Sequence, residues 1–275
     1  MGDATDIGAS VIARLKNKAQ KERLQLQLLY TLSNFKGRPT IDADYLLKNQ
    51  SNDIEDIEKM IIEIMLISIK NDFVTFEIKS LEQIAEQREY NGIRVNMIGF
   101  IKSTKTPFSI DIGVGDVVVP QPSKMELSVL LDDFERPNVL TYSLETTIAE
   151  KFDAIISRME LTSRMKDFFD IYYLASTNNF EGRKLQEAIF KTLENRHTVY
   201  EKDCLIKVLN LVNDKEMLLR WNSFCRKTLK IDLNFKEVIL KIIKFIEIPF
   251  KAILEEDETF YIWNHQEKQY VKNEN

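Results

Sequence analysis

The sequence is poor in cysteine and histidine, the residues that most often mark disulfide scaffolds, zinc sites and thiol or imidazole catalysis. Only two cysteines occur, Cys204 and Cys225, and their spacing forms neither a CxxC pair nor a zinc-ligand pattern. We therefore expect two free thiols in a cytoplasmic protein. The two histidines, His197 and His265, lie in polar stretches, which favours exposed structural roles over a metal site or a catalytic base.

The chain also lacks a long hydrophobic run and an excess of positive charge. Its most apolar stretch, 238–250, is interrupted by charged residues, so we expect no membrane span and no signal peptide. Lys and Arg total 38 against 43 Asp and Glu, and the formal charge of −5 gives no overall basic character. A local basic cluster near the N-terminus is either a solvated face or a face that contacts RNA phosphates. It consists of Arg14, Lys16, Lys18, Lys21 and Arg23.

Glycine and proline are scarce too, with 8 and 6 residues among 275. Together with 44% apolar and 29% charged residues, this is an ordinary globular composition that leans towards helix. The length allows one large domain or two modest ones. We expect an α+β fold, with a short mixed sheet and few helices in residues 1–140 and an all-helical domain in residues 141–275, because no strand pattern follows Thr141.

Hydrophobic periodicity gives the expected elements. In the first part we predict a helix over 7–32, a strand around 42–44, a helix over 52–69 and strands over 73–78, 90–100 and 107–112. In the second part we predict helices from Ser143, from Ser163, and over 182–195, 201–212, 215–230 and 235–250. We expect the apolar stripe of helix 52–69 to pack on the sheet, and Tyr261 and Trp263 to dock back onto the helices.

Two carboxylates separated by one residue, Asp42 and Asp44, are the strongest chemical signal. In an extended segment both point to the same side of the backbone, and paired carboxylates suit Mg²⁺. Gly37 and Pro39 predict a turn that leads into this strand. The alternative is that the acids only hydrogen-bond their own backbone in a turn, as Asp often does.

A third acid, Asp111, stands in the predicted strand 107–112. Its neighbours Ile110 and Ile112 share one face of the strand, so Asp111 is presented on the other face, next to a glycine-containing loop. This position predicts a carboxylate that needs a cationic partner. An Asx-type turn at Asp111 is an equally good interpretation from the local sequence.

Charged residues also accompany the apolar faces of two predicted helices in the second part. Lys151 lies beside a buried stripe, so its side chain either reaches solvent or holds an anion. Asp167 and Asp170 are three residues apart and face the same way on the next helix. Structural roles explain each charge separately, since Asp167 favours a helix N-terminus and Lys166 could pair with Asp170.

Four motifs, in this order, resemble the AbiEii/AbiGii-type nucleotidyltransferase toxins, over about Lys36 to Leu174. They are Gly37-Arg38-Pro39-Thr40-Ile41-Asp42-Ala43-Asp44, Ser109-Ile110-Asp111-Ile112-Gly113-Val114-Gly115-Asp116, Tyr142-Ser143-Leu144-Glu145-Thr146-Thr147-Ile148-Ala149-Glu150-Lys151 and Ser163-Arg164-Met165-Lys166-Asp167-Phe168-Phe169-Asp170. The resemblance implies a minimal polymerase-β-like nucleotidyltransferase core, a helical C-terminal domain and a toxin–antitoxin or phage-defence context. It also implies nucleotide transfer from an NTP to an acceptor, which is tRNA in some members.

The resemblance assigns roles to individual residues. Asp42 and Asp44 match the metal-binding pair, Asp111 takes the place of the third carboxylate, and two Mg²⁺ ions serve in-line transfer. Lys151 is expected near the nucleotide phosphates, and Asp167 matches the acid of the following helix, although Asp170 stays open. Residues expected to contact the nucleotide are Gly37, Arg38, Thr40, Lys151, Arg164 and Lys166. Together these residues predict a cleft, with the aspartates of the first part on one wall and Lys151 and Asp167 on the other.

The sequence departs from this family at one motif. Members of the superfamily place a Gly-Gly or Gly-Ser pair before the Asp-x-Asp strand, where backbone N–H groups receive the triphosphate. No such pair occurs between Arg14 and Lys36. The leading hypothesis is a Mg²⁺-dependent nucleotidyltransferase toxin that acts on tRNA. The alternatives are a catalytically impaired relative that acts as a binding module, and transfer to a small-molecule or protein hydroxyl.

Overall fold

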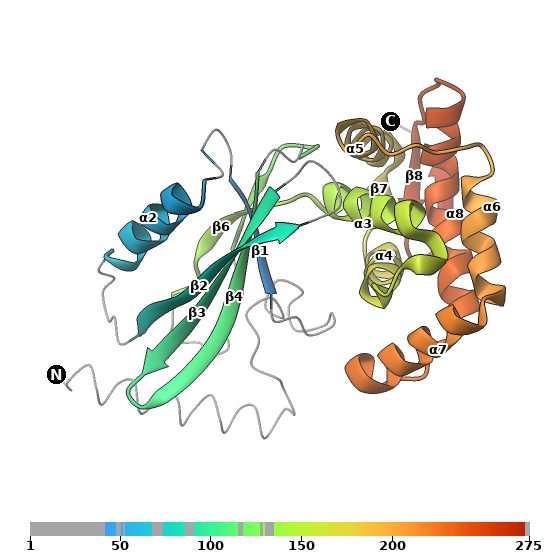
Figure 1. The fold of residues 1–275 in the computed structure, drawn as a ribbon. Helices are drawn as coiled ribbons and strands as arrows, with labels where there is room; N and C mark the ends of the chain where they lie inside the picture. The colour runs from blue at the N-terminus through green and yellow to red at the C-terminus, as the bar shows by residue number, and fades with distance from the viewer. Residues whose placement is uncertain are drawn as a thin grey trace. The chain divides into compact units, whose positions relative to one another are not determined.

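The structure is a computed structural model, and it describes residues 42–47, 51, 53–67, 74–85, 91–114, 118–126, 129 and 135–272. The chain divides into two compact units, which are described separately (Figure 1). The first unit comprises Met1–Asp116 with Glu126–Pro137, and the second comprises Val117–Met125 with Asn138–Asn275. The helix predicted over 7–32, the basic cluster within it, and Gly37, Arg38 and Thr40 lie outside the described residues.

A four-stranded sheet is the main element among the described residues of the first unit. Its strands are β1 (Asp42–Leu47), β2 (Thr75–Ala85), β3 (Asn91–Ile101) and β4 (Thr104–Val114). Their order in the sheet is β1-β4-β3-β2, in which β1 is parallel to β4 and the other neighbours are antiparallel. The predicted α+β class with a short mixed sheet is confirmed. The strands begin and end a few residues away from the predicted positions, as expected for boundaries read from periodicity.

Helix α2 (Ile54–Met65) covers one face of this sheet (Figure 1). Asp53 caps its N-terminus by accepting a hydrogen bond from the backbone N–H of Glu55. The buried residues Ile57 and Ile61 belong to one hydrophobic cluster with the alternate residues of β3 and with Ile112 of β4. The prediction that this helix lays its apolar stripe on the sheet is therefore confirmed. The opposite face of β3 carries the polar residues.

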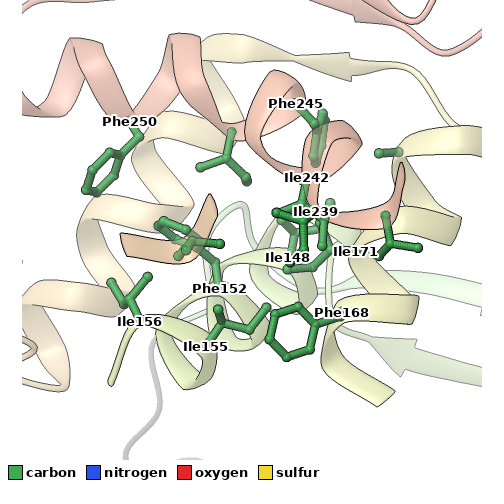
Figure 2. Close-up of a cluster of buried hydrophobic side chains, with 14 of the residues drawn as sticks. Ile148, Phe152, Ile155, Ile156, Phe168, Ile171, Ile239, Ile242, Phe245 and Phe250 are labelled. Carbon is green, nitrogen blue, oxygen red and sulfur yellow. The ribbon is translucent and has the colours of Figure 1, made fainter. Parts of the chain in front are cut away.

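In the part of the second unit that the structure describes, six α-helices make up most of the chain. They are α3 (Leu144–Arg158), α4 (Met165–Thr177), α5 (Gly182–Asn195), α6 (Cys204–Asn210), α7 (Lys215–Phe224) and α8 (Phe235–Leu254). Ser143 caps α3, as predicted, by accepting a hydrogen bond from the N–H of Thr146. Figure 2 shows how side chains of α3, α4 and α8 meet in a single core, with Phe168 and Ile171 of α4 near Ile148 of α3 and Ile242 of α8.

The expectation of an all-helical C-terminal part, without a strand after Thr141, is wrong. A three-stranded sheet joins β7 (Phe180–Glu181), β8 (Tyr261–Asn264) and β9 (Gln269–Lys272). A further strand pair, β5 (Ser123–Glu126) with β6 (Asn138–Thr141), ends at Thr141 and does not bear on that expectation. The later strands are only two to four residues long. They are too short to show a period of two in the sequence, and β7 depends on a partner about 80 residues away.

Two predicted helices also end differently from their patterns. The helix predicted over 201–212 begins at Cys204 and closes with a 3₁₀ turn at Leu211–Asn213. The helix predicted over 215–230 is α-helical only to Phe224 and continues as a π-helical turn, Cys225–Leu229. No helix among the described residues is long and apolar enough to cross a membrane.

Both cysteines are free and buried, as predicted. Burial raises the pKa of the Cys204 thiol to about 11 and also raises the pKa of Cys225. Because the thiolate is the reactive form, neither thiol is poised for catalysis at neutral pH. His197 is exposed, and the Nδ1 atom of His265 lies 2.7 Å from Oδ1 of Asn179.

Candidate functional site

The strand register brings the two predicted acidic motifs together. On the parallel pair β1 and β4, Asp44 is paired with Asp111 and Asp42 is paired with Ser109. Residues paired in register occupy the same face of a sheet, and residues two apart in one strand share that face as well. The positions of Asp42, Asp44 and Asp111 therefore lie on one face, and α2 covers the other. A metal site shared by these three residues requires this arrangement.

An arginine that the sequence did not single out reaches Asp111 from the next strand. Arg94 of β3 is paired with Asp111 and donates two hydrogen bonds to its carboxylate, from Nε to Oδ1 at 2.7 Å and from Nη2 to Oδ2 at 2.6 Å. The side chain of Asp111 is 17% exposed and that of Arg94 is 41% exposed. The predicted need of Asp111 for a cationic partner is thus met within the sheet. The Asx-turn interpretation does not apply, because Asp111 lies inside β4.

A hydrogen-bonded row continues from this pair across the polar face of the sheet. Ser109 donates to Oδ1 of Asn96 at 2.8 Å, and the amide nitrogen of Asn96 donates to Ser80 and to Glu82, each at 2.9 Å. Glu82 is paired in register with Arg94. This row joins polar side chains of β2, β3 and β4 on one surface. Glu82 is hydrogen-bonded within it, two strands away from Asp111.

The acidic residues at these positions are of the type that a divalent ion needs. Mg²⁺ takes oxygen ligands, typically one or two carboxylates with water and substrate phosphates. Carboxylates at the paired positions 44 and 111, with a further one at position 42, fit that donor set. Among the side chains that the structure describes, no group of three possible metal ligands occurs, and the side chains of Asp42 and Asp44 are outside that description. Asp111 is the one of the three acids whose side chain is described, and Arg94 would compete with a metal ion for its carboxylate.

The second unit holds its own cluster of charges, between α3 and α4. The Nζ atom of Lys151 lies 2.8 Å from Oδ2 of Asp170 and 3.5 Å from Oδ1 of Asp167. Arg164 Nε contacts the other oxygen of Asp167 at 2.7 Å. The two acids do face the same way, as their spacing predicts. Since cations occupy both oxygens of Asp167 and its side chain is only 1% exposed, this carboxylate orients Lys151 and Arg164.

The loop before α4 holds Arg164 in place. Thr162 is buried, and its hydroxyl accepts a hydrogen bond from the backbone N–H of Arg164 at 3.1 Å. Arg220 of α7 donates from Nη1 to the backbone oxygens of Glu160 at 2.8 Å and of Thr162 at 3.1 Å. The approach of α7 to this loop had no sequence signal. Lys166 stands in the first turn of α4 with its predicted role untested.

Arg94 is the residue that sequence reasoning missed. A weak signal exists, because the stretch Ile93-Arg94-Val95-Asn96-Met97 alternates between apolar and polar residues, and its apolar members are buried. Alternation predicts that Arg94 lies on the polar face of its strand. It cannot predict that Arg94 stands opposite Asp111, because register depends on how β3 and β4 pair. The predicted cleft between Lys151 and the aspartates stays a prediction.

The family model described as "Nucleotidyl transferase AbiEii toxin, Type IV TA system" matches residues 28–257, which include both charge clusters. A search of curated proteins gives no match. Among solved structures, a candidate nucleotidyltransferase from H. pylori is similar at 11% identity and a TM-score of 0.42, covering 94% of this chain and 100% of that one. JHP933 from Helicobacter pylori is similar at 12% identity and a TM-score of 0.40, covering 80% and 79%.

Proposed function

Because this chain belongs to the AbiEii family of nucleotidyltransferase toxins of type IV toxin–antitoxin systems, we propose that it transfers nucleotides from an NTP to an RNA acceptor, tRNA in particular, with Mg²⁺ as cofactor. One observation carries the proposal. The register pairs Asp44 with Asp111 and places Asp42 on the same face of neighbouring parallel strands. Strands far apart in the chain thus bring the backbone positions of these three residues onto two neighbouring strands, which supports a shared metal site.

Asp42, Asp44 and Asp111 are the residues that would hold Mg²⁺. Bound there, Mg²⁺ would supply charge neutralisation to the phosphates and lower the pKa of the attacking hydroxyl. The protein contributes the positions of its carboxylates, since phosphoryl chemistry depends mainly on positioning and electrostatic stabilisation. Arg94 holds both oxygens of the Asp111 carboxylate by hydrogen bonds, which a bound metal ion would have to replace.

The charge cluster of the second unit supports the same activity. Lys151 and Arg164 carry two positive charges, and Asp167 and Asp170 hold them in place at distances of 2.7 to 3.5 Å. Such fixed cations suit the negative charge of a triphosphate or of an RNA backbone. We assign Asp167 a positioning role instead of a role as general base, because a base must release its partner to accept a proton and Asp167 has cations on both oxygens.

Radiolabelled nucleotide transfer tests the proposal. Purified protein is incubated with Mg²⁺, each labelled NTP in turn and total tRNA, and labelled RNA is expected. Asp42→Ala should abolish the labelling, because one of the three metal-binding acids is removed. Asp56→Ala is the matched control, since Asp56 is an exposed acid of α2 whose partner is Lys59, and this variant should label RNA like the wild type.

The acceptor is decided by the same assay. Labelling of protein or of a small molecule in RNA-free reactions, with no labelling of RNA, would replace the RNA acceptor by a hydroxyl of another class. An absence of incorporation with every NTP and acceptor would contradict the proposed transfer. The family context also proposes a cognate antitoxin, whose co-expression should relieve growth inhibition by the wild-type chain.

A further inference from the structure

Arg94 is a cation placed inside a group of acids, and the assigned metal-binding roles do not explain it. Arg94 donates to both oxygens of the Asp111 carboxylate at nearly equal lengths of 2.7 and 2.6 Å, which is the parallel two-bond geometry of a guanidinium with an oxyanion. The same fork fits two oxygens of a phosphate. Arg94 is also 41% exposed, so solutes can reach it from the solvent side.

Asp111 is the acid that holds Arg94 in the two-bond geometry. Glu82, its register neighbour on β2, already accepts hydrogen bonds from Asn96 and from Ser80, each at 2.9 Å. A ligand that took the guanidinium from Asp111 would therefore free the carboxylate of Asp111 for another cation. In this exchange Arg94 would bind the ligand and Asp111 would bind the other cation.

We propose that Arg94 binds the phosphates of the incoming nucleotide and that, before the nucleotide arrives, it occupies Asp111 in place of the metal ion. The inference rests on the proposed function, since it names a substrate-binding residue of the same site. It also explains how the triphosphate could be bound without the glycine motif of the superfamily. No Gly-Gly or Gly-Ser pair between Arg14 and Lys36 offers backbone N–H donors, and a guanidinium beside the acids supplies two donors and a charge.

A purely structural role is the competing interpretation, because cross-strand ion pairs can stabilise neighbouring strands. The two roles predict different binding behaviour. A structural pair affects every ligand in the same direction, through the stability of the sheet. A residue that exchanges between a carboxylate and a phosphate affects phosphate and metal in opposite directions.

Two equilibrium binding measurements on Arg94→Gln separate these roles. Binding of inorganic tripolyphosphate is measured by calorimetry in EDTA, and binding of Mn²⁺ alone is measured by electron paramagnetic resonance. We expect about tenfold weaker tripolyphosphate binding, because two charge-assisted bonds are lost at a partly exposed site. We expect Mn²⁺ to bind several-fold more tightly, because its competitor is gone. Arg136→Gln, which breaks the ion pair with Glu126, should change neither affinity.

A double-mutant cycle excludes a general effect of charge. Asp111→Asn removes the carboxylate that holds Arg94 by two bonds, and it should strengthen metal-free tripolyphosphate binding in the chain that keeps Arg94. In the Arg94→Gln background the same change should give no gain, because the freed residue is absent. An equal gain in both backgrounds, or unchanged tripolyphosphate binding in Arg94→Gln, would overturn the proposal.

Separate measurements distinguish a change in binding from a loss of folding and from a loss of catalytic activity. Far-ultraviolet circular dichroism and thermal unfolding of each variant show whether the sheet is intact, and Arg94→Lys gives a second variant that keeps the charge without the fork. We expect Arg94→Lys to bind tripolyphosphate with intermediate affinity. None of these binding measurements requires nucleotide transfer. If the ligands bind as expected but RNA is not labelled, only the proposed transfer is contradicted. If the wild-type chain labels RNA but Arg94→Gln binds tripolyphosphate and Mn²⁺ as the wild type does, only the role of Arg94 is contradicted.

Discussion

Asp167 is a carboxylate with almost no access to water, and its two oxygens contact two different cations. Burying a charge is costly unless it is paired and hydrogen-bonded, and removing one partner of a buried pair is correspondingly destabilising. Asp170 contacts the same Lys151 but keeps 16% of its surface exposed. The two acids, which the sequence could not tell apart, therefore differ in what they do.

We predict that Asp167→Asn lowers the free energy of unfolding by about 3 kcal/mol, since it leaves Lys151 and Arg164 with a neutral partner. Asp170→Asn should cost only about 1 kcal/mol, because Lys151 keeps its contact with Asp167 and the carboxylate that is lost was partly exposed. Urea unfolding followed by tryptophan fluorescence measures both. Equal losses in the two variants would show that burial does not separate their roles.

The residue types at this scale were predictable, but their partners were not. Spacing of three placed Asp167 and Asp170 on one helix face, and the strand pattern placed Asp111 opposite Ile110 and Ile112. The contacts of Lys151 with the acids of α4, and of Arg94 with Asp111, join residues 16 to 19 positions apart through helix packing and strand register. Local periodicity contains no information on either.

At the scale of elements, the connection between α3 and α4 depends on a third helix. Arg220 of α7 holds two backbone oxygens of this connection, at Glu160 and Thr162, and also contacts Glu216 within its own helix at 2.8 Å. Thr162 in turn holds the backbone N–H of Arg164. The position of Arg164 is therefore fixed from α7 through a chain of hydrogen bonds, without any contact between the two side chains being required.

We predict that Arg220→Ala reduces kcat/KM for nucleotide transfer about tenfold at a temperature where the variant is fully folded, because Arg164 loses its fixed position. The cost in unfolding free energy should be about 1 kcal/mol. Glu216→Ala is the matched control, since it removes only the exposed partner of Arg220 and leaves both backbone contacts. A loss of activity in Glu216→Ala as large as in Arg220→Ala would contradict this account.

Elements with a strong period were predictable and elements defined by partners were not. Helix α5 has the predicted bounds, and α2 and α8 differ from theirs by only a few residues, because each has a continuous apolar stripe. Strands β7, β8 and β9 escaped because each is too short for a pattern. The only signal was the pair Tyr261 and Trp263, whose docking was predicted, and of these Trp263 is fully buried while Tyr261 is 40% exposed.

On the scale of the whole molecule, each unit has a hydrophobic core of its own. One cluster joins α2 to the four-stranded sheet, and the other runs through the helices from Ile148 to Trp263. Trp263 closes the second core from β8. Its indole N–H donates to the backbone oxygen of Ala175 at 2.7 Å, and its ring lies 5.1 Å from that of Phe245. The C-terminal strands thus contribute to the core that also supports α4 and its charges.

We predict that Trp263→Ala lowers the free energy of unfolding of the second unit by about 3–5 kcal/mol, the usual cost of removing a fully buried aromatic side chain. Trp263→Phe should cost less, since it keeps an aromatic ring in the core and loses mainly the hydrogen bond to Ala175. Tyr261→Ala is the control from the same strand and should cost under about 1 kcal/mol, because that ring is partly exposed. Thermal unfolding monitored by circular dichroism measures all three. If Trp263→Ala and Tyr261→Ala unfolded at the same temperature, β8 would not be part of the core, and the charges of α4 would have to be supported by the helices alone.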